Sequence, residues 1–140
     1  MARLNLARFY RSETGAVAVE FVLIAPILFA LLFGIITLGY FMGVSHSVNE
    51  VAAGAARASV AGLDQTEREA LADAYIREAH RRYPLLDQDA ITETLTYEGA
   101  SPAGISVAVT YDIDGSLLDI ANGFLGLGLT AIKRSAYVAY

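Results

Sequence analysis

The longest feature in the pattern of hydrophobic and polar positions is an apolar run close to the N-terminus. Between Ala16 and Val44 the only charged residue is Glu20, and the next charge follows at Glu50. About 20 consecutive apolar residues are enough for a helix to cross a bilayer core roughly 30 Å thick. The pattern therefore predicts a transmembrane helix over residues 16–44.

The same helix is predicted to continue past the apolar run. Its small and apolar residues now recur every three or four positions, while Glu50 and Arg57 fall on the other side, which is typical of an amphipathic helix. A straight helix over residues 16–61 would be about 70 Å long at 1.5 Å per residue. Gly62 is expected to end it. The inward positions are Val48, Val51, Ala52, Ala55, Ser59 and Val60.

A second helix is expected directly afterwards. Asp64 and Glu67 form a D-x-x-E capping box that opens it, and Pro84 stops it. Its charged residues are mixed in sign, as on a solvated face. The region 45–83 is thus predicted to be helical. The expected inward positions of the second helix are Leu71, Ala74, Tyr75, Glu78, Ala79 and Tyr83.

Alternating patterns then predict a small sheet within residues 91–140. Apolar and polar residues alternate over 91–97 and again over 105–111, and a Gly- and Pro-containing link joins them, so we expect an antiparallel hairpin. A short apolar helix over 117–125 and a last strand over 129–140 complete the α+β class, with roughly three antiparallel strands. The apolar stripe at 124–129 is expected to belong to the core, and its glycines leave a mobile, exposed loop as the alternative.

Glu20 is the informative exception in the apolar run. A carboxylate at mid-membrane costs on the order of 2.5 to 3.5 kcal/mol, so it usually has a partner. A cut between Gly15 and Ala16 would create one, because the new α-amino group would be largely protonated at neutral pH. That amine and Glu20 would lie on one helix face, about 6 Å apart along the axis.

A glycine before the cut, a glutamate at the fifth following position and a phenylalanine, Phe21, at the sixth make a compound signal. It resembles the class III signal of type IV prepilins and, more closely, TadE-like minor pseudopilins of bacterial tight-adherence (Flp-type) pilus systems. Major Flp pilins look shorter than this chain, and TadG-like relatives look longer. The resemblance is carried by Glu13 to Phe21, Ala25-Pro26, Gly34 to Gly39 and the Ala-rich Glu50 to Arg57.

The resemblance implies a structural role in pilus biogenesis for adherence, biofilm formation and secretion. A membrane prepilin peptidase would remove residues 1–15 as a cytoplasmic leader. Residues 45–140 would form a pilin-like domain outside the cytoplasm. Glu20 and Phe21 would help to set assembly register. The implied partners are the major Flp pilin, a TadF-like minor pseudopilin, the inner-membrane platform with its secretion ATPase, and inner-membrane lipid.

Charge agrees with that topology. Residues 1–15 carry three arginines and one glutamate, a net charge of +2, whereas the rest of the chain has 7 basic and 14 acidic residues, a net charge of −7. Arg3, Arg8 and Arg11 therefore favour a cytoplasmic N-terminus and a periplasmic C-terminal domain. An acidic domain has no electrostatic footprint for nucleic acid. The absence of cysteine excludes disulfides and thiol chemistry.

Two further features of the span bear on packing. Pro26 removes one backbone hydrogen bond and is expected to kink the helix. Gly39 and Gly43 form a G-x-x-x-G that Ser47 continues, which favours a close contact between helices. The alternative is that glycine is simply frequent in membrane helices.

Candidate chemistry is sparse. Asp112 and Asp114 precede Gly115 as in a calcium loop, but the bidentate glutamate is missing, so a turn is favoured. His46 and His80 have no second ligand at metal spacing. No nucleophile or phosphate-binding motif is found. We expect neither an enzyme nor a cofactor or metal site.

Two other readings remain open. The first is an uncleaved, single-pass membrane-anchored envelope protein that binds a partner through its acidic domain. Gly15 distinguishes the two, because a simple anchor has no need of it. The second is a secreted domain released near Ala55 after a conventional signal, although the apolar run is about twice the length of such a signal core.

Overall fold

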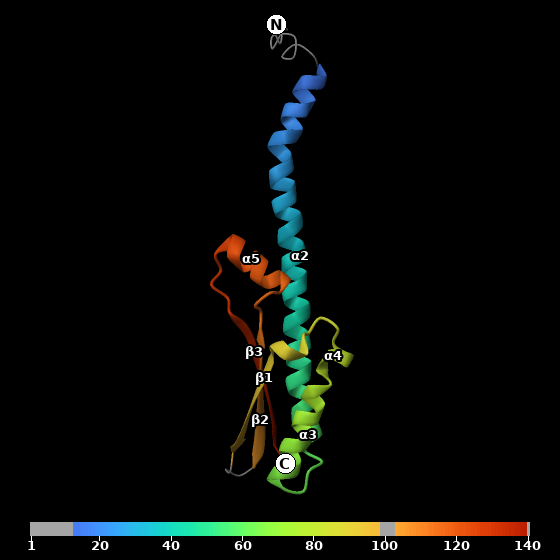
Figure 1. Cartoon of the computed structure of the whole chain (residues 1–140), viewed down its shortest axis with the longest axis vertical. Helices are drawn as coiled ribbons and strands as arrows, with labels where there is room; N and C mark the ends of the chain where they lie inside the picture. Colours follow the sequence, from blue (N-terminus) through green and yellow to red (C-terminus); the bar gives the residue numbers. More distant parts are fainter. Residues whose placement is uncertain (1–12, 99–102, 140) are drawn as a thin grey trace. The chain divides into compact units, whose positions relative to one another are not determined.

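The computed structural model describes residues 13–98 and 103–139, and Figure 1 shows the order of its elements. The α+β class predicted from the sequence is confirmed. The leader arginines and the centre of the link between the first two strands lie outside the described residues. The elements are α2 (Glu13–Ser59), α3 (Gln65–Arg77), α4 (Ala79–Arg82), the 3-10 turn η1 (Gln88–Ala90), β1 (Ile91–Glu98), β2 (Gly104–Asp112), α5 (Leu117–Leu125) and β3 (Ala131–Ala139).

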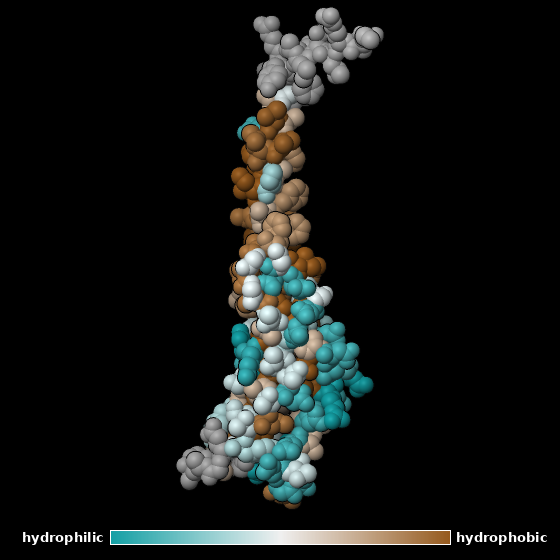
Figure 2. Space-filling view, turned by 60° about the vertical axis from the view of Figure 1, so that its left-hand side comes forward, coloured by the Kyte–Doolittle hydropathy of each residue, from teal (hydrophilic) through white to brown (hydrophobic). Residues whose placement is uncertain are grey.

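The chain divides into two compact units, Met1–Leu38 and Gly39–Tyr140. In the first unit, the described residues form one helix whose large apolar side chains are all exposed, between Val17 and Leu38, by 49% to 71%. In Figure 2 the face of this helix that is in view is mostly brown, the colour of apolar residues. Within the described part of the chain, Gly15–Ser59 is the helix long and apolar enough to cross a membrane. The chain therefore has a single-pass membrane anchor.

The second unit is built around the C-terminal part of α2. Six of its apolar residues there are fully buried, as is Ser59, and their spacing places them on one face of the helix. They share one hydrophobic core with α3 and β2. The amphipathic continuation predicted from the sequence is confirmed, except that Val60 lies beyond the helix and is 41% exposed. The six residues are Val44, Val48, Val51, Ala52, Ala55 and Ala56.

Helix α2 ends at Ser59, and the reason for Gly62 differs from the one expected. Gly62 does not have the positive φ of a left-handed helix cap. A Cβ at Gly62 would instead lie 2.6 Å from the backbone nitrogen of Arg68, whose Nε also donates to the Gly62 carbonyl oxygen at 2.9 Å. Glycine therefore allows the start of α3 to approach this turn closely.

The cap of α3 is confirmed, with one difference in its partners. The Asp64 side chain accepts a hydrogen bond from the Glu67 backbone nitrogen at 2.9 Å. The Glu67 carboxylate, however, accepts from the backbone nitrogen of Leu63 rather than from that of Asp64. The helix then breaks at Glu78, so that α3 and the single turn α4 replace the one helix expected up to Tyr83.

The predicted inward face of α3 was partly wrong. Ala72, Ile76 and Ala79 are the buried residues of α3 and α4, whereas Leu71 is 39% exposed and Ala74 is also exposed. Ala79 is buried as expected, whereas Ala72 and Ile76 were not among the expected inward positions. These buried residues belong to the same hydrophobic core as the alanine-rich face of α2.

The three strands form one antiparallel sheet in the order β1-β2-β3. Tyr111 pairs with Ile91 on one side and with Ile132 on the other, so β2 is the central strand. The alternation predicted for β2 is confirmed, since its inward residues are buried and their neighbours are less so. These inward residues are Ile105, Val107, Val109 and Tyr111.

Helix α5 connects β2 to β3. The Ser116 side chain caps its N-terminus by accepting from the Leu118 backbone nitrogen at 3.1 Å, and Gly126 ends the helix with φ of 64°. The apolar stripe over 124–129 was expected in the core, and this expectation was wrong. Phe124 is 88% exposed, and Leu118 is the buried residue of α5. A nine-residue helix can bury only one narrow face, so its other apolar side chains face outward.

Candidate assembly segment on the N-terminal helix

The predicted cleavage site lies within α2. Among the described residues this helix extends from Glu13 to Ser59, so both Gly15 and Ala16 belong to it. Glu20 follows Ala16 by four residues, which places the two on one helix face about 6 Å apart along the axis.

Glu20 is surrounded by apolar residues of the same helix. Glu20 and Phe21 are both exposed, and no salt bridge within residues 13–98 and 103–139 includes Glu20. The segment thus presents an apolar cylinder that carries one carboxylate near its start. In hydrocarbon this carboxylate needs a cation, and the pairing of Glu20 with the Ala16 amine stays a prediction.

Pro26 lies inside α2, which continues as helix on both sides of it. Gly39 and Gly43, where a close contact between helices was predicted, have different surroundings. A Cβ at Gly39 would meet no atom within 4 Å, so this position remains open for a neighbouring helix. A Cβ at Gly43 would lie 3.0 Å from Leu85 Cδ1, so the loop after α4 already occupies that side of the helix.

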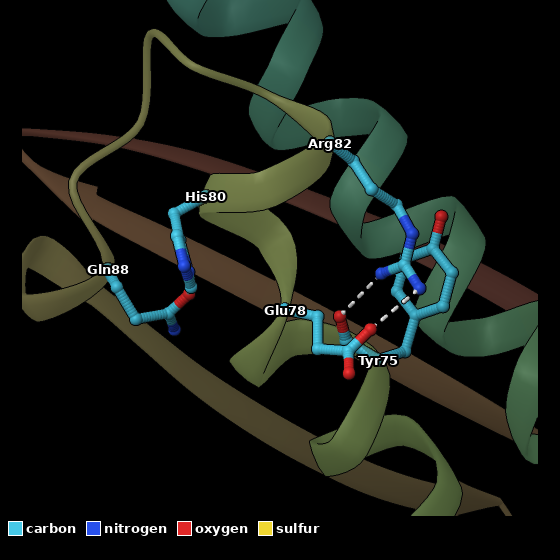
Figure 3. A network of polar contacts seen from close by, with 5 residues as sticks. All are labelled: Tyr75, Glu78, His80, Arg82 and Gln88. Atoms are coloured by element: carbon cyan, nitrogen blue, oxygen red, sulfur yellow. Dashed lines mark hydrogen bonds and ion pairs between the residues drawn. The ribbon is translucent and has the colours of Figure 1, made fainter.

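A second cluster of polar residues lies on α3 and α4, as Figure 3 shows. The Arg82 guanidinium stacks on the Tyr75 ring, with Cζ 4.3 Å from the ring centroid. It also donates to the Tyr75 carbonyl oxygen at 3.2 Å and to the Glu78 carboxylate at 3.3 Å. Nearby, His80 Nδ1 lies 3.3 Å from the Gln88 side-chain oxygen.

This cluster holds the break between α3 and α4 in place. Tyr75 packs against α2 at Gly54, where a Cβ would overlap the phenol ring. The pKa of the Tyr83 phenol is raised, first by desolvation and then by a side-chain hydrogen bond with Tyr75 and the nearby charge of Glu50, while Arg82 opposes the shift. Sequence reasoning assigned these charges to a solvated face. The spacing of Glu78 and Arg82 was the signal available for one of these contacts.

Other predicted positions behave as ordinary polar residues. The Asp112 side chain accepts from the Asp114 backbone nitrogen at 3.0 Å, and Gly115 has φ of 71°, so the turn predicted there is confirmed. His46 is exposed on α2. Among the residues that the structure describes, no three His, Asp or Glu side chains gather as a metal site would require.

The comparisons with known proteins agree with the segment described above. The family model described as TadE-like protein matches residues 15–57. No curated protein and no solved structure matches the chain. The matched range covers the predicted junction, Glu20 and the whole helical stretch up to Arg57. It confirms the resemblance that the sequence indicated: residues 15–57 are similar to the TadE-like family.

Proposed function

We propose that this chain is a minor pseudopilin of a tight-adherence pilus system, cut between Gly15 and Ala16 by a prepilin peptidase. The observation that supports this most strongly is the position of Glu20 within the TadE-like segment. It is the single charge on an otherwise apolar, exposed helix surface, and it follows the proposed new N-terminus by one helical turn.

The role of Glu20 follows from the cost of an unpaired charge. Breaking a buried ion pair by removing one partner is strongly destabilising, since the remaining charge is left uncompensated. When apolar helices pack side by side, only those arrangements that bring an Ala16 amine to a Glu20 carboxylate avoid this cost. The pair therefore selects the axial register of neighbouring subunits.

The proposed topology places the leader in the cytoplasm and the acidic unit in the periplasm. Three arginines precede the apolar stretch 16–44, and no lysine or arginine follows it before Arg57. Before assembly, the processed subunit is stored in the inner membrane. It then joins the major Flp pilin and a TadF-like subunit at the inner-membrane platform and secretion ATPase, where it primes or supports the fibre used in adherence, biofilm formation and secretion.

Processing is tested by intact mass and N-terminal sequencing of the chain from native membranes, with and without the peptidase gene. We expect a chain that begins at Ala16 only when the peptidase is present, and Gly15→Leu should prevent the cut. If residues 1–15 remain in both strains, the chain is the uncleaved membrane-anchored envelope protein, and its function is partner binding by the acidic unit.

Assembly is tested separately with Glu20→Gln, which keeps the shape of the side chain and removes its charge. We expect normal processing, normal membrane insertion and a loss of piliation. Thr37→Ala provides the control, because it removes another polar side chain from the same helix without changing its charge. Normal piliation by Glu20→Gln would overturn the register role while leaving the processing result intact.

A further inference from the structure

An exposed apolar surface covers the outer side of α5 and the loop that follows it. On the helix, Leu117, Ile120 and Phe124 are spaced by three and four residues and thus share one face. The loop adds further leucines to this surface, which we call the α5 patch. The exposed fractions are 58% for Leu117, 69% for Ile120, 88% for Phe124, 55% for Leu125, 54% for Leu127 and 40% for Leu129.

The loop is held in a defined shape. The Asn122 side chain donates to the Leu129 carbonyl oxygen at 2.6 Å and accepts from the Leu129 backbone nitrogen at 2.9 Å. Gly126 and Gly128 both have positive φ, which lets the chain turn tightly between these bonds. Leu127 and Leu129, the two leucines of the loop, are therefore displayed outward by local hydrogen bonds rather than by burial of their own side chains.

The start of α5 lies at one particular end of the second unit. Tyr40, Gly115 and Ser116 line the same surface hollow. The unit itself begins at Gly39, directly after the apolar stretch that supplies the membrane anchor. The start of α5 therefore lies at the end of the second unit through which the chain enters it from the apolar stretch.

Charge indicates what kind of surface fits the patch. Over residues 117–129 the single charged residue is Asp119, whose carboxylate accepts a hydrogen bond from the Gly115 backbone nitrogen at 3.2 Å. No lysine or arginine lies in this stretch to attract anionic groups. The patch is suited to the apolar interior of a lipid surface, in the way that interfacial helices bind by buried apolar area.

We propose that α5 and its loop insert into the surface of the membrane that anchors the chain, and so give the second unit its own lipid contact. This goes beyond the pilus role and does not depend on cleavage or on Glu20. Insertion removes the six large apolar side chains of the α5 patch from water, which explains why α5 and its loop expose so many of them.

The test uses the full chain in lipid nanodiscs, one copy per disc. Because the chain has no cysteine, single cysteines can be introduced without other changes. Phe124→Cys and Leu127→Cys report on the patch, and Leu63→Cys serves as the control, since Leu63 is 90% exposed in the same unit. We expect a membrane-impermeant maleimide to label the patch cysteines about tenfold more slowly than Leu63→Cys.

A polarity-sensitive fluorophore on the same cysteines should show blue-shifted emission at the patch and quenching by spin-labelled lipid, and neither effect at Leu63→Cys. Phosphatidylcholine alone should suffice, with little gain from added phosphatidylglycerol. Fast labelling and no lipid quenching would overturn the proposal. Protection that appears only with two copies per disc would do so as well, since it would assign the patch to a second copy of the chain.

Discussion

At Gly54 the absence of a side chain decides how closely two helices approach. Gly54 is buried within α2, and the Tyr75 phenol fills the space that a Cβ would need. Replacing a helical glycine by alanine ordinarily gains up to about 1 kcal/mol. We predict the opposite sign for Gly54→Ala, a loss of about 1 to 3 kcal/mol, because the ring must move.

Urea unfolding of the detergent-solubilised chain, followed by near-UV circular dichroism of tyrosine, measures this loss. Gly123→Ala is the matched control, because a Cβ at this helical position would meet no atom within 4 Å. It should leave stability unchanged or raise it. In a Tyr75→Ala background, Gly54→Ala should also lose its cost. A cost that persists there would show that the phenol is not its cause.

Tyr83 predicts how stability depends on alkaline pH. The pKa of its phenol is raised above the ordinary value of 10.0, chiefly by desolvation, so the folded state favours the neutral form. The contribution of the neutral phenol to the free energy of unfolding is complete below the pKa that Tyr83 has in the unfolded chain. It is lost as the pH rises through the pKa of Tyr83 in the folded protein. We expect Tyr83→Phe to weaken the decline of unfolding free energy above about pH 10. Parallel pH profiles for the two proteins would contradict this.

Individual residues differed in how far the sequence revealed them. Glu20 stands out in the sequence because a charge within an apolar run is costly, whereas its role and the cut after Gly15 stay predictions. The contacts of Tyr75 with Arg82 and Gly54 could not, since they depend on how α3 meets α2. Gly62 was correctly expected at a helix end, but its reason is the approach of Arg68.

Among the elements, α3 has the most clearly defined start. Asp64 caps it by accepting from the Glu67 backbone nitrogen, and Glu67 in turn accepts from Leu63. We expect Asp64→Ala to cost about 1 kcal/mol of unfolding free energy, the usual contribution of such a cap. Asp64→Ser should recover most of it in the same urea titration. An equal loss for both variants would mean that the carboxylate charge, rather than the cap, matters.

The type and order of the elements could be predicted because each segment has a clear hydrophobic pattern. The span is continuously apolar, apolar residues recur about every 3.6 positions in its helical continuation, and they recur every second position in the strands. The inward face of α3 could not. Its apolar residues are distributed around the helix, and the choice of Ala72 and Ile76 over Leu71 depends on the shape of α2. The exposure of Phe124 was not predicted for a similar reason, because hydrophobicity alone does not distinguish a core residue from an apolar residue on an outward-facing surface.

At the scale of the whole molecule, orientation should follow the leader arginines. We predict that changing Arg3, Arg8 and Arg11 to glutamate reverses or scrambles the orientation in the membrane. Labelling Leu63→Cys with an impermeant maleimide in spheroplasts measures it. The parent chain should be labelled from outside, and the charge-reversed chain much less. Equal labelling of the two chains would show that these arginines do not determine the orientation in the membrane.

The α+β architecture was predictable as a whole because, among the described residues, one helix is long enough to supply both the apolar anchor and a part of the core. What the sequence did not reveal is which surfaces remain uncovered. Two such surfaces are the apolar side chains on all sides of the anchor helix and the α5 patch. What covers them lies outside the chain, and the spacing of apolar residues along a sequence does not reveal it.

The helical conformation around Gly15 and Ala16 has a consequence for the proposed processing. The bond between these two residues lies inside α2, and cleavage of a folded chain depends on local opening of such structure. Gly15 lowers the cost of that opening, because a glycine inside a helix is less favourable than an alanine by about 1 kcal/mol. The rate of the proposed cut would therefore depend on how readily this part of the helix opens.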